Sequence, residues 1–199
     1  GITADMLKQS GDAAPHVFNA IKNAVEGNWK GALDEFKAAG KAAPDVMAKV
    51  GQAIYDKLPQ DVKDNLVKLG IDEKKVAEGA AALPHLVDAA VAAKDGKWGD
   101  ALQALREAGQ AAPTIAKDAI KNLANKYLPE GTAKQILTND KVLNELITNP
   151  KVQDAIGKLF SNDDKTVMAG ARELLANETI RGEVLTAIGA NPKVQAALD

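Results

Sequence analysis

Apolar residues recur along this chain at the spacing of an α-helix. One stripe begins at each tryptophan and follows positions i, i+3, i+4 and i+7: Trp29, Ala32, Leu33 and Phe36, and again Trp98, Ala101, Leu102 and Leu105. Such a stripe places apolar side chains on one face of a helix, where they can pack against a neighbouring element. The pattern therefore predicts one amphipathic helix after each tryptophan.

A second set of stripes follows the two Ala-Ala-Pro segments. Its members are Val46, Met47, Val50, Ala53, Ile54 and Leu58 in the first case, and Ile115, Ala119, Ile120, Leu123 and Tyr127 in the second. A shorter helix is predicted from Val62, Leu66, Val67 and Leu69. Prolines stand at the junctions, where they end one helix or open the next: Pro15, Pro44, Pro59, Pro84, Pro113 and Pro129.

No segment alternates apolar and polar residues with the period of two that is typical of strands. We therefore expect an all-α fold of tandem helical hairpins, stacked as a short solenoid or packed as a compact helical bundle.

The chain also contains an internal duplication. Residues 15–44 align without a gap with residues 84–113, at an offset of sixty-nine, and thirteen of the thirty pairs are identical. The pairs include both histidines and both tryptophans of the protein: His16 with His85, and Trp29 with Trp98. Outside this block, Gly1-Ile2 precedes Gly70-Ile71 by the same offset, and Leu58-Pro59 precedes Leu128-Pro129 by seventy. We therefore predict one helical unit over residues 1–69 and a second over residues 70–131.

Residues 132–199 are predicted to be either a diverged third unit or a C-terminal helical cap. The segment is about one unit long, and residues 149–153 can be placed over 83–87, but it contains no Trp, His or Tyr. Because end units of helical arrays are often atypical, both interpretations stay open. Asn139, Asn149-Pro150 and Asn191-Pro192 predict starts of short helices, since Asn is a strong N-cap and Pro is tolerated in the first turn.

Residues 27–44 and 96–113 resemble the second helix of a tetratricopeptide repeat. That pattern has Gly, a nearby aromatic residue, Ala, a large residue, Ala and Pro at set spacings. Both segments match it: Gly27, Trp29, Ala32, Phe36, Ala39 and Pro44, then Gly96, Trp98, Ala101, Leu105, Ala108 and Pro113. The resemblance implies that neighbouring helices approach closely at the small residues and that each Pro turns the chain into the next hairpin. It weakens outside these segments, because Asn19 and Asp88 stand where the family carries Leu.

Composition and charge narrow the range of partners. The chain has 46% hydrophobic and 26% charged residues, and its net charge is −2 with lysines scattered among the acids. We therefore expect no nucleic-acid partner. The absence of Cys excludes disulfides and thiolate metal sites.

Nothing in the sequence predicts a transmembrane segment. The longest Ala-rich apolar run, residues 79–93, is interrupted by His85 and Asp88 and is too short to span a bilayer. No signal peptide is visible, and a first residue other than Met is consistent with a processed product. Localisation stays open between the cytoplasm and export with a targeting segment removed.

The two histidines and the large aromatic residues are the candidates for chemistry. His16 and His85 follow Pro at helix starts and could act as general bases or pH-responsive groups. Since no acid or nucleophile recurs beside them in the sequence, we interpret them as capping or packing groups. Trp29 and Trp98 are interpreted as anchors of the hairpin cores, not as ligand platforms. Tyr55 and Tyr127 are interpreted in the same way, with their hydroxyls at the surface.

Residues 162–173 partly match a calcium-binding loop. The ligand positions one, three, five and twelve carry Asn162, Asp164, Thr166 and Glu173. The required Gly is replaced by Val167, so we interpret Asp163 and Asp164 as first-turn acids that interact with a helix dipole. Phosphate-binding loops, His-Glu-x-x-His motifs and nucleophile elbows are absent. We therefore predict no catalytic, cofactor-binding or metal-binding residue and no cofactor.

A duplicated helical unit without recognisable chemistry predicts a non-enzymatic module for protein–protein interaction, which binds a protein or peptide on a concave face or in a groove between units. Two alternatives stay open. One is a secreted bacterial effector or toxin domain, which the Cys-free, Ala-rich composition permits. The other is a lipid-associating helical protein, although membrane-surface association is the less expected case. An enzyme with an unfamiliar site is a further, less favoured option.

Overall fold

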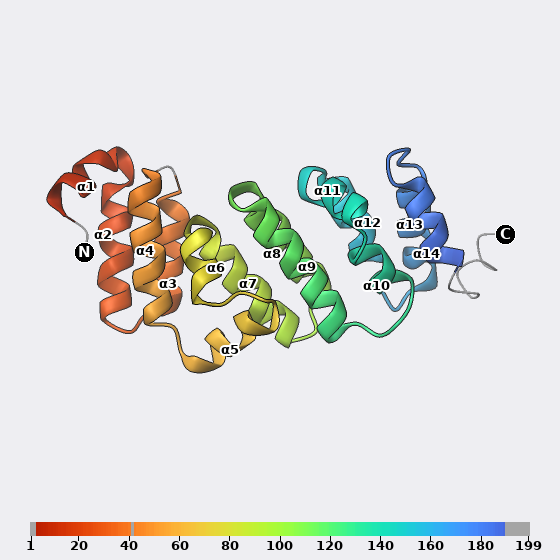
Figure 1. The fold of residues 1–199 in the computed structure, drawn as a ribbon, viewed down its shortest axis with the longest axis horizontal. Coiled ribbons are helices and arrows are strands. Elements are labelled where there is room, and N and C mark those ends of the chain that lie inside the picture. The colour runs from red at the N-terminus through yellow and green to blue at the C-terminus, as the bar shows by residue number, and fades with distance from the viewer. Residues whose placement is uncertain (1–2, 41, 190–199) are drawn as a thin grey trace.

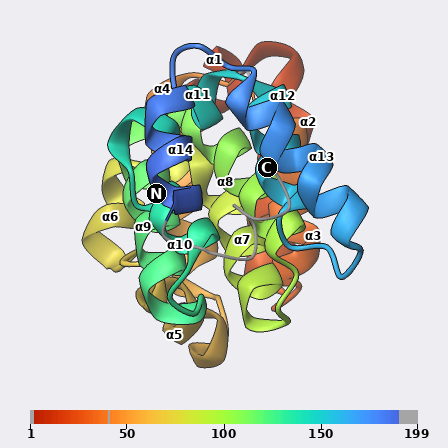
Figure 2. The ribbon, with the colours of Figure 1, turned by 90° about the vertical axis from the view of Figure 1, so that its right-hand side faces the viewer.

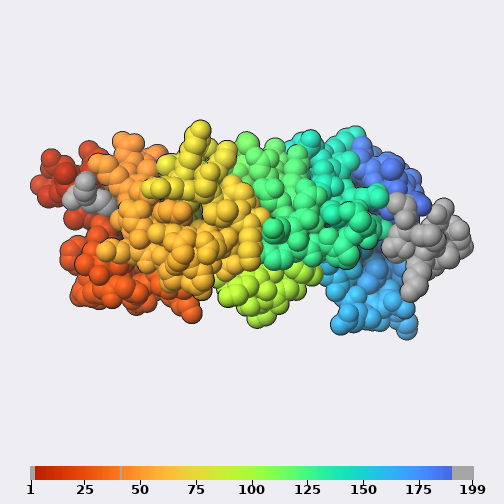
Figure 3. All heavy atoms as spheres, turned by 60° about the horizontal axis from the view of Figure 1, so that its bottom comes forward, coloured from red at the N-terminus to blue at the C-terminus, as the bar shows by residue number. Residues whose placement is uncertain are grey.

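The computed structural model describes residues 3–40 and 42–189, which form fourteen α-helices, two short 3₁₀ helices and no strand. The all-α prediction is confirmed. The helices follow one another along the long axis of the molecule, from α1 to α14 (Figure 1). The view toward the C-terminal end places α13 and α14 in front (Figure 2). The space-filling view shows the same succession of segments along a continuous elongated surface (Figure 3).

The first predicted unit contains α1 (Ala4–Gln9), the 3₁₀ helix η1 (Gly11–Ala13), α2 (Ala14–Val25), α3 (Trp29–Ala38), α4 (Pro44–Asp56) and α5 (Gln60–Lys68). The second contains α6 (Glu73–Glu78), the 3₁₀ helix η2 (Ala80–Ala82), α7 (Leu83–Lys94), α8 (Trp98–Ala111) and α9 (Pro113–Tyr127). The remaining segment forms α10 (Thr132–Leu137), α11 (Asp140–Thr148), α12 (Pro150–Lys158), α13 (Asp164–Leu175) and α14 (Arg181–Gly189).

The duplicated sequence forms elements that begin at matching positions. The elements α6, η2, α7, α8 and α9 each begin sixty-nine residues after α1, η1, α2, α3 and α4. The turns match as well, since Gly27 and Gly96 both adopt positive φ, at 81° and 73°. This backbone conformation favours glycine and ends α2 and α7 at the same point. The two segments therefore share both their sequence pattern and their local geometry. Gly1-Ile2, which the sequence pairs with Gly70-Ile71, lies outside the described residues.

The stripes that begin at the tryptophans lie in the core. Ala32, Leu33 and Phe36 of α3 are buried, as are their counterparts Ala101, Leu102 and Leu105 of α8. Helix α3 packs against α2, and α8 packs against α7. Ala32 and Ala101 are both 0% exposed, so small side chains lie on the buried faces of α3 and α8.

The predicted shorter helix is confirmed as α5, which contains Val62, Leu66 and Val67 and ends directly before Leu69. Val67 of α5 is 56% exposed, whereas Val62, Leu66 and Leu69 are buried. These three residues follow i, i+4 and i+7 and therefore share one face. Val67 is turned about 100° from Leu66 on the same helix, so it points toward solvent.

The first and second predicted units meet where α3, α4 and α5 pack against η2, α6 and α7. Gly51 of α4 lies at the closest point of this contact. A Cβ at Gly51 would stand 2.9 Å from the carbonyl oxygen of Ala80 and 2.8 Å from its Cβ. Glycine is therefore needed here to let α4 approach the backbone of η2.

The C-terminal segment continues the array. Helix α12 packs against both α8 and α13, α11 packs against α8 and α9, and α10 packs against α9 and α14. Asn139 and Asn149 cap α11 and α12, and Pro150 stands in the first turn, as predicted. Asn191-Pro192 lies outside the described residues. Whether 132–199 is a third unit or a cap stays a prediction, as do the unit boundaries.

Candidate functional site

Each histidine lies beside a glutamate of the next helix. His16 Nδ1 of α2 is 2.8 Å from Glu35 Oε2 of α3, a hydrogen-bonding distance. His85 Nδ1 of α7 is 3.1 Å from Glu107 Oε2 of α8. The latter contact lacks hydrogen-bond geometry, so the buried His85 Nδ1 has no hydrogen-bond partner among the described residues. Each histidine therefore has an acid beside it in space, which the sequence did not indicate.

The two glutamates do not occupy matching sequence positions. Glu35 aligns with Ala104, and Glu107 aligns with Ala38, which is exposed. Positions 35 and 38 are one helical turn apart on the same face of α3, so a carboxylate at either position can reach the histidine. Sequence alignment missed the pairs because it compares single positions. The pairs join helices within each unit, which agrees with a packing role for the histidines.

The tryptophans lie at the junctions between successive segments and are only partly buried. Trp29 borders a groove of about 400 Å³ between α3 and α7, whose lining also includes Asp34, Asp88 and Asp95. Lys37 of α3 crosses this junction and contacts Asp88 Oδ2 at 2.6 Å. The interpretation of Trp29 as a hairpin-core anchor was therefore incomplete, because its ring is also part of a surface groove.

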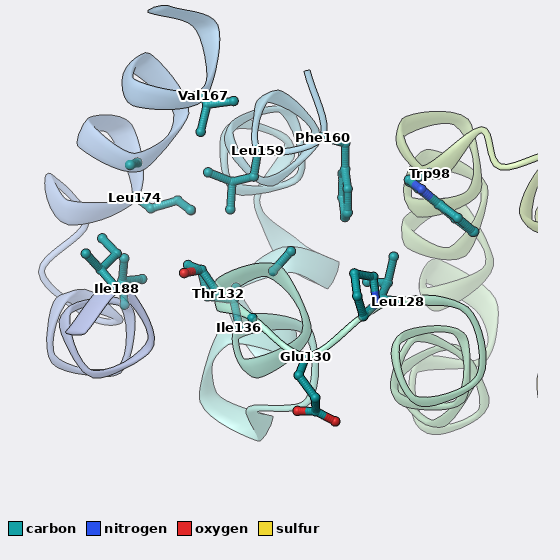
Figure 4. Close-up of a pocket in the computed structure, with 15 residues that line it drawn as sticks. Trp98, Leu128, Glu130, Thr132, Ile136, Leu159, Phe160, Val167, Leu174 and Ile188 are labelled. Atoms are coloured by element: carbon teal, nitrogen blue, oxygen red, sulfur yellow. The ribbon is translucent and has the colours of Figure 1, made fainter. Parts of the chain in front are cut away.

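Trp98 occupies the corresponding place at the next junction and forms one wall of a cavity of about 420 Å³. The lining comes from α8, the α9–α10 connection, α10, the end of α12, α13 and α14: Trp98, Leu128, Pro129, Glu130, Gly131, Thr132, Ala133, Ile136, Leu159, Phe160, Val167, Ala171, Leu174, Val184 and Ile188 (Figure 4). Figure 4 shows Leu159 and Phe160 on one side of the open space and Leu128 and Ile136 on the other. We call this space the C-terminal cavity.

Two aromatic rings, those of Trp98 and Phe160, line the C-terminal cavity next to α8, and Tyr127 packs against Trp98 outside the lining. The ring centroid of Trp98 is 5.7 Å from that of Tyr127 and 6.5 Å from that of Phe160, and both pairs are tilted. These are favourable distances for aromatic pairs. Because Trp98, Tyr127 and Phe160 come from α8, α9 and the end of α12, the cluster also ties these segments together.

Tyr127 departs from its predicted arrangement. Its hydroxyl is buried and has no hydrogen-bond partner among the described residues. Burial disfavours the charged phenolate and raises the pKa of Tyr127 above its ordinary value. The hydroxyl does not reach the surface, because the ring packs beneath Trp98 at the junction.

The side-chain polar groups of Thr132 and Glu130 at the C-terminal cavity are already engaged. The hydroxyl of Thr132 donates a hydrogen bond to the carbonyl oxygen of Ala187 at 3.3 Å. Glu130 Oε1 is 2.7 Å from Lys134 Nζ, and Figure 4 shows its carboxylate directed away from the other labelled side chains. The described lining therefore offers mainly aliphatic and aromatic surface, which suits an apolar group more than a charged one.

The partial calcium motif folds as a helix. Asp163 caps α13, its Oδ2 accepts a hydrogen bond from the hydroxyl of Thr166 at 2.8 Å, and Asp164 is the first helical residue. Glu173 lies in the last turn and is 2.5 Å from Lys158 Nζ. These positions cannot close around one ion. Within the described part of the chain, no three His, Asp or Glu side chains form a group that could hold a metal.

Sequence reasoning did not find the C-terminal cavity. Its apolar residues have the pattern of ordinary core positions, since Ile136, Leu174 and Ile188 are buried. Periodicity identifies the face of a helix that is buried. It does not show whether the helices that bury it fill the space between them or leave a cavity. The one available signal was Phe160, an aromatic residue that follows the predicted helix start at Asn149-Pro150 by ten residues.

Comparison of the chain with known protein families, curated proteins and solved structures finds no match in any of the three. The resemblance to tetratricopeptide repeats therefore stays a prediction from the sequence. None of the helices in the described residues is long and apolar enough to cross a membrane.

Proposed function

We propose that this protein is a non-enzymatic interaction module that binds an apolar segment of a partner protein in the C-terminal cavity. The observation that carries the proposal is the cavity itself: about 420 Å³, open to the surface and lined by side chains from six segments of the array. This volume is within the range of specific ligand sites. It suits a few apolar side chains of a peptide better than a whole folded surface.

The aromatic wall supports a peptide ligand. Trp and Tyr are enriched among the residues that dominate binding energy at interfaces, particularly where they border a pocket that excludes water. Trp98 combines a large apolar surface with an indole N–H that can donate to a peptide carbonyl. Because Thr132 and Glu130 already have partners, the specificity of the cavity would come from its shape and from this ring.

Two observations favour binding over catalysis. The histidines, which are the strongest candidates for acid–base chemistry, contact Glu35 and Glu107 within their own units. Neither histidine is among the residues that line the C-terminal cavity. The chain therefore keeps its histidines apart from the cavity that would hold a ligand.

Trp98 provides the reporter for a direct test. A Trp29→Phe variant keeps Trp98 as the single tryptophan, and peptides selected from a displayed random library can then be titrated while its emission is followed. We expect saturable binding of peptides with two or more large apolar residues, together with a shift of the Trp98 emission. Ala133→Phe, which places a ring in the cavity, should weaken binding at least tenfold.

Ala77→Phe is the matched control, because Ala77 is exposed on α6 and outside the cavity lining. It should leave the affinity unchanged. Equal affinity of the Ala133→Phe variant and the parent protein would contradict the proposed site.

Lipid association is a second candidate, since the same aliphatic lining can accept an acyl chain. A fluorescent fatty acid distinguishes the two functions. If the fatty acid binds tightly and the selected peptides do not displace it, the cavity is a lipid site and the peptide proposal fails.

A further inference from the structure

A second apolar groove lies at the N-terminal end of the array, between α1, α2 and α4. Its volume is about 560 Å³, and its apolar lining comes from Leu7, Phe18, Ile21 and Ala53. Phe18 is 57% exposed, which is unusual for an aromatic residue of this size. We call this the N-terminal groove. It shares no lining residue with the C-terminal cavity.

On the matching face of the second unit, the counterparts of the three large apolar residues are buried. Leu7, Phe18 and Ile21 lie sixty-nine residues before Val76, Val87 and Ala90. Those three counterparts are 0%, 1% and 0% exposed. The same helical arrangement is therefore buried in one copy and open in the other.

Helix α5 and the residues after it are part of the cover in the second unit. Helix α5 packs against both α7 and α9, with Val62 and Leu66 buried, and Leu69 and Ile71 after the helix are each 1% exposed. Asn122 of α9 donates a hydrogen bond from Nδ2 to the carbonyl oxygen of Leu69 at 3.0 Å. The amphipathic helix α5 thus lies against the helices that carry the matching face, and one side-chain hydrogen bond joins α9 to the segment after α5. Helix α3 borders the same face, because Trp29 and Leu33 share a groove with Val87.

Gly70 makes this arrangement possible. Its φ of +78° favours glycine, and a Cβ at this position would collide with Nδ2 of Asn122. The covering segment therefore has two requirements: apolar residues at i, i+4 and i+7, and a glycine directly after the last of them. Both are met by Val62, Leu66, Leu69 and Gly70.

A comparable contact recurs further along the array. Helix α10 follows Leu128-Pro129 as α5 follows Leu58-Pro59, and α10 packs against α14 as α5 packs against α9. In the described part of the chain, no such helix lies against α2 and α4. Ala53, which is sixty-nine residues before Asn122, lacks the amide that anchors the covering segment in the second unit.

We propose that the N-terminal groove binds one amphipathic helix of a partner protein, with large apolar residues at i, i+4 and i+7 followed by a glycine, in the position that α5 occupies on α7 and α9. This site goes beyond the function proposed for the C-terminal cavity and does not depend on it. The proposal is motivated by the second unit, in which the matching face of α7 and α9 already forms an interface with α5.

The chain supplies its own probe for the test. A fluorescein-labelled peptide with the sequence of residues 59–72 is titrated with the full-length protein, and fluorescence anisotropy is measured. We expect saturable binding. Phe18→Asp should weaken it at least tenfold, because the charge would be buried under the peptide without a partner. Leu185→Asp is the matched control on α14, since Leu185 is also exposed, at 53%, and should leave binding unchanged.

A variant that should bind the peptide more tightly provides an independent test. Ala53→Asn introduces the amide that Asn122 supplies in the second unit, and one net hydrogen bond should tighten binding about three- to tenfold. The gain should disappear with a peptide in which the residue matching Gly70 is alanine. Circular dichroism tests whether each variant is folded. We expect the Phe18→Asp variant to fold, because Phe18 is exposed.

Three outcomes would overturn the proposal. The first is the absence of saturable binding. The second is equal binding to the Phe18→Asp and parent proteins, which would mean that the peptide displaces α5 from its own place. The third is concentration-dependent dimerisation that Phe18→Asp abolishes while no peptide binds, which would identify a second copy as the occupant. An effect of Ala133→Phe is not expected, so failure at this groove and failure at the C-terminal cavity can be distinguished.

Discussion

Arg106 of α8 donates a hydrogen bond from Nε to Oε1 of Gln153 on α12, at 3.0 Å. Gln153 is only 8% exposed, so the amide is held at a junction from which water is largely excluded. The bond joins the second predicted unit to the C-terminal segment, where α8 packs against α12. Polar groups in such a position are destabilising unless they are paired.

Replacing Gln153 should therefore weaken this junction. Gln153→Ala removes the acceptor and leaves the partly buried guanidinium of Arg106 without it, which should lower the free energy of unfolding by about 1 to 2 kcal/mol. Urea denaturation followed by circular dichroism measures the change. Gln103→Ala on the exposed face of α8 is the control, and a loss of similar size there would show that the hydrogen bond has no special role.

The close contact at Gly51 predicts opposite effects for two glycine substitutions. Gly51→Ala should destabilise the protein by about 1 to 3 kcal/mol, because its Cβ meets the backbone of Ala80, which has little freedom to move. Gly157→Ala in α12 should stabilise it by about 0.5 to 1 kcal/mol, since nothing described lies within 4 Å and alanine restricts the unfolded chain. Thermal denaturation of both variants decides the matter, and a Gly51→Ala variant at least as stable as the parent protein would refute the packing at η2.

The buried hydroxyl of Tyr127 predicts how stability depends on alkaline pH. Burial raises the pKa of Tyr127 in the folded protein, so the unfolded chain loses this proton first as the pH rises. The stabilisation is present below about pH 10, the ordinary pKa of tyrosine, and is lost as the pH rises through the higher folded-state value. Unfolding free energies measured between pH 8 and pH 11 should therefore fall with pH, and should fall less steeply in Tyr127→Phe.

Tyr55 contributes to the same dependence. Its pKa is raised by burial first, and then by the nearby carboxylates of Glu73, Asp72 and Asp56. Tyr55→Phe should therefore also reduce the alkaline slope, and the double variant should reduce it most. At pH 7, Tyr127→Phe should be at least as stable as the parent, because it removes a buried hydroxyl that lacks a described partner. An unchanged alkaline slope in the double variant would contradict this account.

The different positions of Glu35 and Glu107 predict that stability lost by removing Glu35 can be restored by a glutamate at position 38. Glu35→Ala removes the contact with His16 and should cost up to about 1 kcal/mol, the usual range for a partly exposed pair. Adding Ala38→Glu restores a carboxylate at the position that Glu107 has in the second unit, and should recover most of the loss. Thermal denaturation measures both effects. Ala38→Glu alone should change little, and a double variant no more stable than Glu35→Ala would show that position 38 does not reach the histidine.

The sequence predicted the helices well because their apolar positions recur at helical spacing and their ends carry Pro, Gly and Asn. The buried faces of α3, α4, α8 and α9 follow directly from the stripes at residues 29–58 and 98–127.

The candidate sites were harder to predict, since they depend on how helices meet and not on what each contains. Phe18 of the N-terminal groove and its counterpart Val87 both follow a Pro-His pair, yet their exposure is opposite because different elements lie beside α2 and α7. Likewise, the aromatic cluster of Trp98, Tyr127 and Phe160 joins residues that are more than twenty-five positions apart in the chain.

The one-turn difference between Glu35 and Glu107 also concerns how this unit can vary. A carboxylate nineteen residues after the histidine contacts it in the first unit, and one twenty-two residues after contacts it in the second. The contact is thus a property of a helix face, and either position can be given up while the other carries the acid. A sequence with glutamate at both positions would keep a carboxylate beside the histidine. The glutamate can therefore change from one position to the other by successive substitutions, and the histidine has a neighbouring carboxylate at every step.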